Sequence, residues 1–249
     1  MSPLEHISEP SFTSSARGLM TLFLIGLVKI VIGVEFTTNV IAIPWLPKIE
    51  LTHIHLLTHL YWGLVAYAVY RYILHNVVNF REVKFDSLYQ ALQPANIGER
   101  FVYSNIFTSG GYYEVSKKLA DDTISNNCIT LKQYVDENET ACSFSFYFDS
   151  SYTFELIDCQ VTPHYSCEDF VVNIPELSDK WGLYHYCGAP GDEEGYRVKH
   201  FGDYKFSIYG LIFHKYIKLL LTEKRTFDLV LPILLNIGLF LVWFTNLVT

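Results

Sequence analysis

Long apolar stretches lie near both ends of the chain, and the region between them has a different pattern. The first covers residues 18–34 and stays largely apolar to residue 46, the second covers about residues 54–74, and the third covers residues 227–248. About 20 consecutive apolar residues are enough for a helix to cross the roughly 30 Å hydrocarbon core of a bilayer. We therefore expect an α-helical membrane anchor of three spans, assembled into an oligomeric bundle.

Short alternating runs replace the long apolar stretches in the middle of the chain. In residues 142–148, Phe144, Phe146 and Phe148 alternate with polar or smaller side chains. After a polar turn, residues 152–157 show a second alternation, with Tyr152, Phe154 and Leu156 at every other position. A period of two is typical of a strand with one buried face, so these two runs predict a β-hairpin. The sequence thus indicates an α+β soluble domain inserted between spans two and three.

Two further helices are expected around this domain. A helix is predicted over residues 113–122, after a glycine-containing turn. Apolar and aromatic residues then recur at three- and four-residue steps between about residues 206 and 221, which predicts an amphipathic helix leading to the third span. The expected organisation is an N-terminal cytoplasmic segment (1–17), a two-helix transmembrane hairpin (18–79), a cytoplasmic α+β sensor domain (80–204), and a linker helix with the C-terminal span (205–249).

Basic residues next to the spans predict the orientation, because Lys and Arg are enriched on the cytoplasmic side. Of the basic residues near the ends of the three predicted spans, all but Lys48 fall on one side of the bilayer. We therefore expect a multi-pass membrane protein with its N-terminus and central domain in the cytoplasm. The residues on that side are Arg17, Arg71, Arg81, Lys84, Lys215, Lys218, Lys224 and Arg225.

Charge and cysteine content narrow the classes of partner. Residues 96–196 hold seventeen Asp and Glu against five Lys and Arg, a net charge of −12, whereas the whole chain is −8. Binding of duplex nucleic acid is disfavoured because it needs clustered basic residues, although a pocket could still hold one nucleotide. The five cysteines form no CxxC pair, so no metal or other cofactor is expected.

The odd number of cysteines fits a reduced cytoplasmic domain. The sequon at residues 138–140 leaves an extracytoplasmic, disulfide-bonded domain open as the alternative.

Polar residues within the apolar stretches are candidates for function. Lys29, Glu35 and Asn236 are predicted to lie at similar depth, where charged groups are costly unless they pair or face water. They could line an ion pathway in an oligomer. Equally, they could hold the helices together through interhelical hydrogen bonds. Three histidines at 53, 55 and 59 show two members one helical turn apart but no further metal ligand.

The central domain is rich in aromatic residues, which suits either a core or a ligand site. Tyr147, Tyr152, Trp181 and Tyr184 are our candidates for stacking on a nucleotide or a short oligonucleotide signal. Most aromatic residues are simply buried, which is the competing interpretation. No P-loop, nucleophile elbow or zinc-protease motif is present in the sequence, so no catalytic residue is assigned and an enzyme is not expected.

The layout of two N-terminal spans, a sensor-sized domain and a C-terminal span introduced by EKRTFDLVLPILL resembles bacterial membrane proteins encoded in anti-phage defence loci. The resemblance is one of organisation, and it implies a ligand-regulated channel or pore in the inner membrane that responds to a nucleotide-type signal. Three spans per chain are too few to enclose a pathway, so a homo-oligomer would be needed. Two alternatives stay open: a non-conducting membrane scaffold that tethers a protein-interaction domain, and a receptor-like protein with an extracytoplasmic domain.

Overall fold

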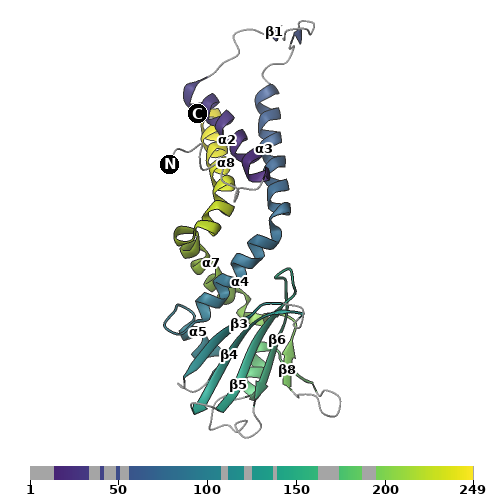
Figure 1. Cartoon of the computed structure of the whole chain (residues 1–249), viewed down its shortest axis with the longest axis vertical. Coiled ribbons are helices and arrows are strands. Elements are labelled where there is room, and N and C mark those ends of the chain that lie inside the picture. The colour runs from purple at the N-terminus through teal and green to yellow at the C-terminus, as the bar shows by residue number, and fades with distance from the viewer. Residues whose placement is uncertain are drawn as a thin grey trace. The chain divides into compact units, whose positions relative to one another are not determined.

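The computed structural model describes residues 14–33, 40–41, 49–50, 56–107, 112–120, 125–136, 139–161, 174–186 and 195–248 (Figure 1). The chain divides into two compact units. The helical unit comprises Met1–Val77 and Glu223–Thr249, and the α+β unit comprises Val78–Thr222. The amphipathic segment that precedes the C-terminal helix therefore groups with the sheet.

Long helices predominate among the described residues of the helical unit (Figure 1). They are α2 (Ser14–Ile32), α3 (Leu56–His75) and α8 (Lys224–Val248). Two strands of two residues each, β1 (Val40–Ile41) and β2 (Ile49–Glu50), pair with each other in antiparallel fashion. Helix α2 ends where Gly33 adopts a left-handed conformation with φ +69°, which glycine tolerates best.

Close packing in the helical unit depends on one glycine. A Cβ at Gly26 would lie 2.3 Å from the Tyr61 hydroxyl and 2.6 Å from a methyl group of Leu239, so no larger residue fits without a shift. Tyr61 donates a hydrogen bond to the carbonyl of Leu22 (2.5 Å), and the rings of Trp62 and Trp243 lie 5.2 Å apart. These contacts bring α2, α3 and α8 together.

The expectation of three membrane spans is wrong. Within the described residues, a single helix, Lys224–Leu247, is long and apolar enough to cross a membrane. Helix α2 stops at Ile32 instead of continuing towards residue 46, and it includes Arg17 and Lys29. Helix α3 contains Arg71 and four tyrosines, which reduce its apolar character.

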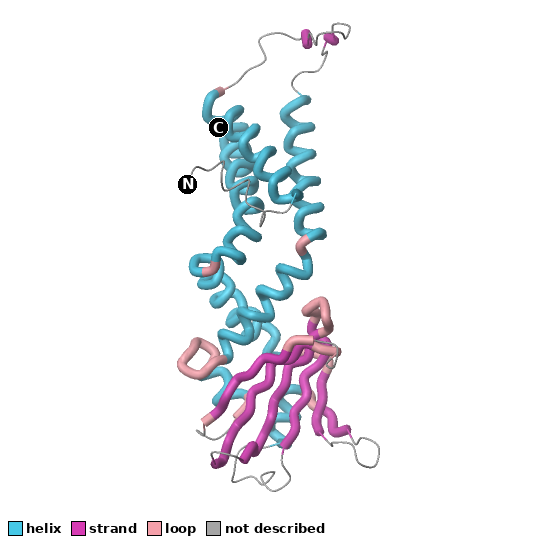
Figure 2. The backbone as a smooth tube through the Cα atoms, in the orientation of Figure 1, coloured by secondary structure: helices cyan, strands magenta, loops and turns pink. Residues whose placement is uncertain are grey.

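The α+β unit is built on an antiparallel sheet, drawn in magenta in Figure 2. Its six strands lie in the order β3-β4-β5-β6-β8-β7. Its strands are β3 (Tyr113–Lys118), β4 (Asn127–Asp136), β5 (Glu139–Phe148), β6 (Phe154–Val161), β7 (Tyr184–Tyr186) and β8 (Gly195–Val198). Its helices are α4 (Val77–Leu92), α5 (Glu99–Asn105), α6 (Ile174–Trp181), the 3-10 turn η2 (Gly202–Tyr204) and α7 (Lys205–Thr222).

Helices pack against one face of this sheet. Phe144, Phe146 and Phe148 on β5 are buried there, in a core that includes residues of α4, α5, α6 and α7. Trp181 is fully buried in the same core, and its indole nitrogen donates a hydrogen bond to the Asn105 carbonyl (2.8 Å). The predicted hairpin is confirmed, because β5 and β6 pair in the register Phe144↔Cys159.

The turn of this hairpin is organised by one carboxylate. Asp149 Oδ1 accepts hydrogen bonds from the backbone of Ser151 (2.8 Å) and Thr153 (2.7 Å), while Tyr152 has a left-handed φ of 59°. Arg81 of α4 donates to the Thr153 hydroxyl (2.9 Å) and so ties the turn to the helix layer.

The predicted helix over residues 113–122 is wrong. Residues 113–118 form β3, whose Tyr113 pairs with Gln133 of β4. The pairing places Tyr113 in the core and Glu114 on the opposite side of the sheet, and this alternation suits a strand.

Candidate functional site

The sheet face opposite the helices carries a continuous line of polar and aromatic residues. Directly opposed residues of an antiparallel pair point to the same face. The strand register pairs Ser116 with Thr130, Thr130 with Ser145, Ser145 with Asp158, Asp158 with Arg197, and Arg197 with Tyr184. We name this set, one residue from each strand, the polar row: Ser116, Thr130, Ser145, Asp158, Arg197 and Tyr184.

Hydrogen bonds link members of the polar row. The hydroxyls of Thr130 and Ser145 lie 3.0 Å apart, and Arg197 Nε donates to Asp158 Oδ1 at 2.7 Å. The Asp158 side chain is only 4% exposed, whereas that of Arg197 is 40% exposed. The carboxylate is therefore held inside the surface, and the guanidinium reaches from it towards solvent.

Aromatic rings flank this ion pair. The guanidinium of Arg197 lies over the Tyr186 ring, with its central carbon 3.7 Å from the ring centroid, which is close enough for a cation–π contact. Tyr147 lies on the same face of β5, and burial, followed by the neighbouring Cys128 and Asp158 side chains, raises the pKa of its hydroxyl to about 12. These phenols stay protonated and neutral at physiological pH.

The thiol of Cys128 lies on this face of the sheet. Burial raises the pKa of the Cys128 thiol, whose sulfur lies 3.2 Å from the Thr130 hydroxyl, so Cys128 is not activated as a nucleophile. Within the described ranges, no group of three or more His, Cys, Asp and Glu side chains could hold a metal ion. The arrangement offers hydrogen-bond donors, acceptors and aromatic surface.

The four predicted ligand-binding residues do not form one site. Tyr147 and Tyr184 lie on the face of the polar row, with Tyr184 51% exposed. Trp181 is in the core, and the Tyr152 ring packs beside Phe85 at 5.4 Å. Trp181 therefore stabilises the fold and presents no stacking surface to a ligand, whereas Tyr152 is half-buried against the core.

Two of the three predicted pore-lining residues make contacts between helices. Lys29 of α2 donates a hydrogen bond to the Thr58 hydroxyl of α3. Asn236 of α8 is 1% exposed and donates to the carbonyls of Leu19 (3.1 Å) and Pro232 (2.8 Å). Leu19 and Lys29 are ten residues apart in one helix, about 15 Å along its axis, so Lys29 and Asn236 do not share a depth.

Several other predicted features lie outside the described residues: Glu35, His53, His55, Lys48, Asn138, Cys167 and Cys187. Of the histidine group, the His59 ring lies edge-on to Trp243 at 6.2 Å. Of the cysteines, the sulfurs of Cys142 and Cys159 lie 3.9 Å apart in the core, and Cys128 lies on the other face of the sheet.

No protein-family model matches the chain, and neither does a curated protein or a solved structure. The similarity of layout to anti-phage membrane effectors therefore stays a prediction. Sequence reasoning missed the polar row because its members come from six separate strands, and only the register of the sheet aligns them.

Proposed function

We propose that this protein is a membrane-anchored interaction protein, in which α8 inserts into a bilayer and the α+β unit binds a protein partner through the polar row. The observation that carries the proposal is the row itself, which crosses every strand of the sheet on the face opposite the described helices. In this proposal the protein tethers a partner to the membrane and catalyses no reaction.

The distribution of polarity in α8 supports the anchor. Leu241 is 55% exposed, and Phe244 and Leu247 are also largely exposed, while Asn236 on the same helix is buried. In water this exposure of large apolar side chains would be unfavourable, since burying each stabilises by about 2 kcal/mol. In hydrocarbon it is favourable, and the Asn236 amide nitrogen donates both of its hydrogen bonds to backbone carbonyls inside the protein.

The exposed members of the polar row suit a protein partner. Tyrosine and arginine are enriched among the residues that dominate protein–protein binding energy. Arg197 gives its Nε–H to Asp158, and the other donors of its planar fork can meet carbonyl or carboxylate oxygens. The net charge of −12 over residues 96–196 disfavours a polyanionic ligand such as nucleic acid.

The channel hypothesis stays a prediction, with less support than the anchor. The contacts of Lys29 with Thr58 and of Asn236 with Leu19 favour the interhelical hydrogen-bond interpretation of these residues. Both contacts form within one chain and need no oligomeric axis.

A pair of matched tyrosine variants tests recognition. Tyr184 on the polar row is 51% exposed, and Tyr209 on α7 is 47% exposed. Full-length protein, purified in mild detergent after cross-linking in cells, is compared as wild type, Tyr184→Ala and Tyr209→Ala by quantitative mass spectrometry. We expect a partner whose recovery falls about ten-fold or more with Tyr184→Ala, a typical loss for a tyrosine at the centre of an interface, and does not change with Tyr209→Ala.

Identical recovery of all proteins with both variants would contradict recognition by the polar row.

The anchor is tested separately by alkaline carbonate extraction of membranes, which releases peripheral proteins and leaves inserted ones. Release of the whole chain into the soluble fraction would rule out insertion of α8.

A further inference from the structure

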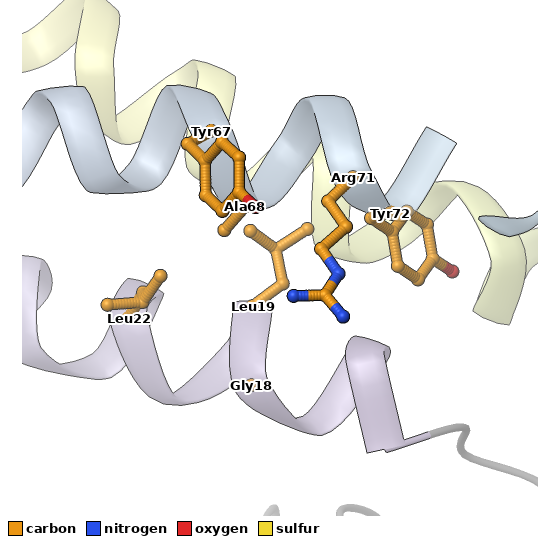
Figure 3. A pocket seen from close by; sticks show the side chains of 7 residues that line it. All are labelled: Gly18, Leu19, Leu22, Tyr67, Ala68, Arg71 and Tyr72. Atoms are coloured by element: carbon orange, nitrogen blue, oxygen red, sulfur yellow. The ribbon is translucent and has the colours of Figure 1, made fainter. Parts of the chain in front are cut away.

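The helical unit contains a cleft that the proposed anchor and binding face do not use. Its volume is about 350 Å³, and it lies between α2 and α3 (Figure 3). Residues of α2 supply one wall and residues of α3 supply the other. Its lining comprises Gly18, Leu19, Leu22, Tyr67, Ala68, Arg71 and Tyr72.

One cation extends across this cleft. In Figure 3 the side chain of Arg71 reaches from α3 towards α2, and its guanidinium lies near Gly18 and Leu19. Among the described residues, none forms a hydrogen bond or an ion pair with this guanidinium. A fork of N–H donors with no acceptor among the described residues, next to leucine side chains, is suited to a ligand with an anionic and an apolar part.

The position of the cleft along the helices indicates where that ligand comes from. Tyr72, the neighbour of Arg71, donates a hydrogen bond to the carbonyl of Leu229 (3.0 Å), close to the start of α8. Lys224 and Arg225 begin that helix. Basic residues at one end of a spanning helix lie at the level of lipid headgroups, where phosphates are concentrated.

We infer that the cleft between α2 and α3 binds the headgroup phosphate of an anionic phospholipid, with Arg71 as its main ligand and the partly exposed Leu22 against an acyl chain. This inference rests on the proposed membrane anchor. Arginine binds phosphate through two parallel, charge-assisted hydrogen bonds, which a glutamine in its place cannot supply. Gly18 leaves room for the headgroup, since a Cβ there would meet no described atom within 4 Å.

Two pairs of variants test the site in the full-length protein. Arg71→Gln removes the charge, and Arg100→Gln makes the same change at an exposed arginine of the α+β unit. Gly18→Leu fills the cleft and keeps Arg71, whereas Gly63→Leu adds the same side chain to α3, where a Cβ also meets open space. Replacing glycine within a helix raises helix propensity, so both leucine variants are expected to fold.

The measurement is native mass spectrometry in an uncharged detergent with added phosphatidylglycerol, phosphatidylcholine or inorganic phosphate. We expect one phosphatidylglycerol retained per chain, with affinity about ten-fold or more lower for Arg71→Gln and Gly18→Leu, as for loss of one strong charge-assisted contact. Arg100→Gln and Gly63→Leu should bind as wild type does.

Three outcomes would overturn the inference: equal retention of phosphatidylcholine, competition by inorganic phosphate at equal concentration, and unchanged retention by both cleft variants. Carbonate extraction distinguishes these from failure of the anchor. A chain that stays in the membrane but shows no selective retention removes the lipid site alone, whereas a chain released from the membrane removes the proposed function as well.

Discussion

The two units of this chain distribute polarity in opposite ways. In the helical unit, Leu241 faces outward and Asn236 is buried, with its amide donating to backbone carbonyls. In the α+β unit, Phe146 and Trp181 are fully buried, and the polar row lies on the opposite face of the sheet, where Ser145 and Asp158 are buried and Tyr184 is exposed. An exposed leucine such as Leu241 is favourable in hydrocarbon, as the proposed anchor requires, whereas a buried aromatic core is favourable in water.

The largest effect is expected from a buried phenylalanine of the α+β unit. Phe146→Ala should destabilise this unit by about 3–5 kcal/mol, because the cavity left in the core adds to the lost transfer free energy. The matched change in the helical unit is Leu241→Ala, at a side chain that is largely exposed. It should cost well under 1 kcal/mol in detergent. Denaturant titration of the full-length protein, followed by tryptophan fluorescence, measures the free energy of unfolding of both variants. Equal losses of stability would contradict the proposal that α8 lies in hydrocarbon.

Two ion pairs of similar length should differ in strength because they differ in burial. Arg197→Ala leaves Asp158, 4% exposed, without its partner and should cost about 2 kcal/mol. Lys117→Ala removes the 2.8 Å pair with Asp86, whose side chain is 33% exposed, and should cost less than 1 kcal/mol. Equilibrium unfolding measures both, and a larger loss for Lys117→Ala would show that the polar row is more hydrated than its burial indicates.

A smaller effect is expected at the buried amide of α8. Asn236→Ala removes the hydrogen bond to Leu19 and should lower the stability of the helical unit by about 0.6 kcal/mol, the average for hydrogen bonds between helices in membranes. Asn246→Ala, at an exposed position of the same helix, is the control and should have no effect. Unfolding in mixed micelles gives both values.

Planar-bilayer recording adds a second readout for this residue. A conductance that changes with Asn236→Ala or Lys29→Ala, with no loss of stability, would favour the pore over the interhelical hydrogen bonds.

The smallest effect is expected from acid at the β5–β6 turn. The backbone N–H of Thr153 foremost, followed by the Ser151 groups, holds the pKa of Asp149 below its ordinary value. A carboxyl with a lowered folded-state pKa contributes stability that is complete above its unfolded pKa of about 3.9 and is lost as the pH falls through the folded value. Asp149→Asn should therefore lower stability at neutral pH and weaken its dependence on pH below about 4. Thermal unfolding between pH 7 and pH 3 measures this, and an unchanged pH dependence would contradict it.

Local patterns explain why parts of both units could be predicted. The β5–β6 hairpin follows from alternation within residues 142–157, and α8 follows from a single apolar run. By contrast, residues 113–118 join the sheet as β3 because β4, whose sequence lies further along the chain, offers a strand to pair with. Trp181 was a ligand candidate by residue type, and only the packing of α6 on the sheet shows that it belongs to the core.

The sequence by itself determined the apolar C-terminal helix, the hairpin and the segregation of acidic from basic segments, since each depends on neighbouring residues in the chain. The tertiary structure decided the end of α2 at Gly33, the partners of Lys29 and Asn236, the cleft beside Arg71 and the alignment of the polar row. These depend on which distant segments meet and in what register. A one-residue shift of any strand would turn its member of the polar row towards the core, and no local pattern encodes that choice.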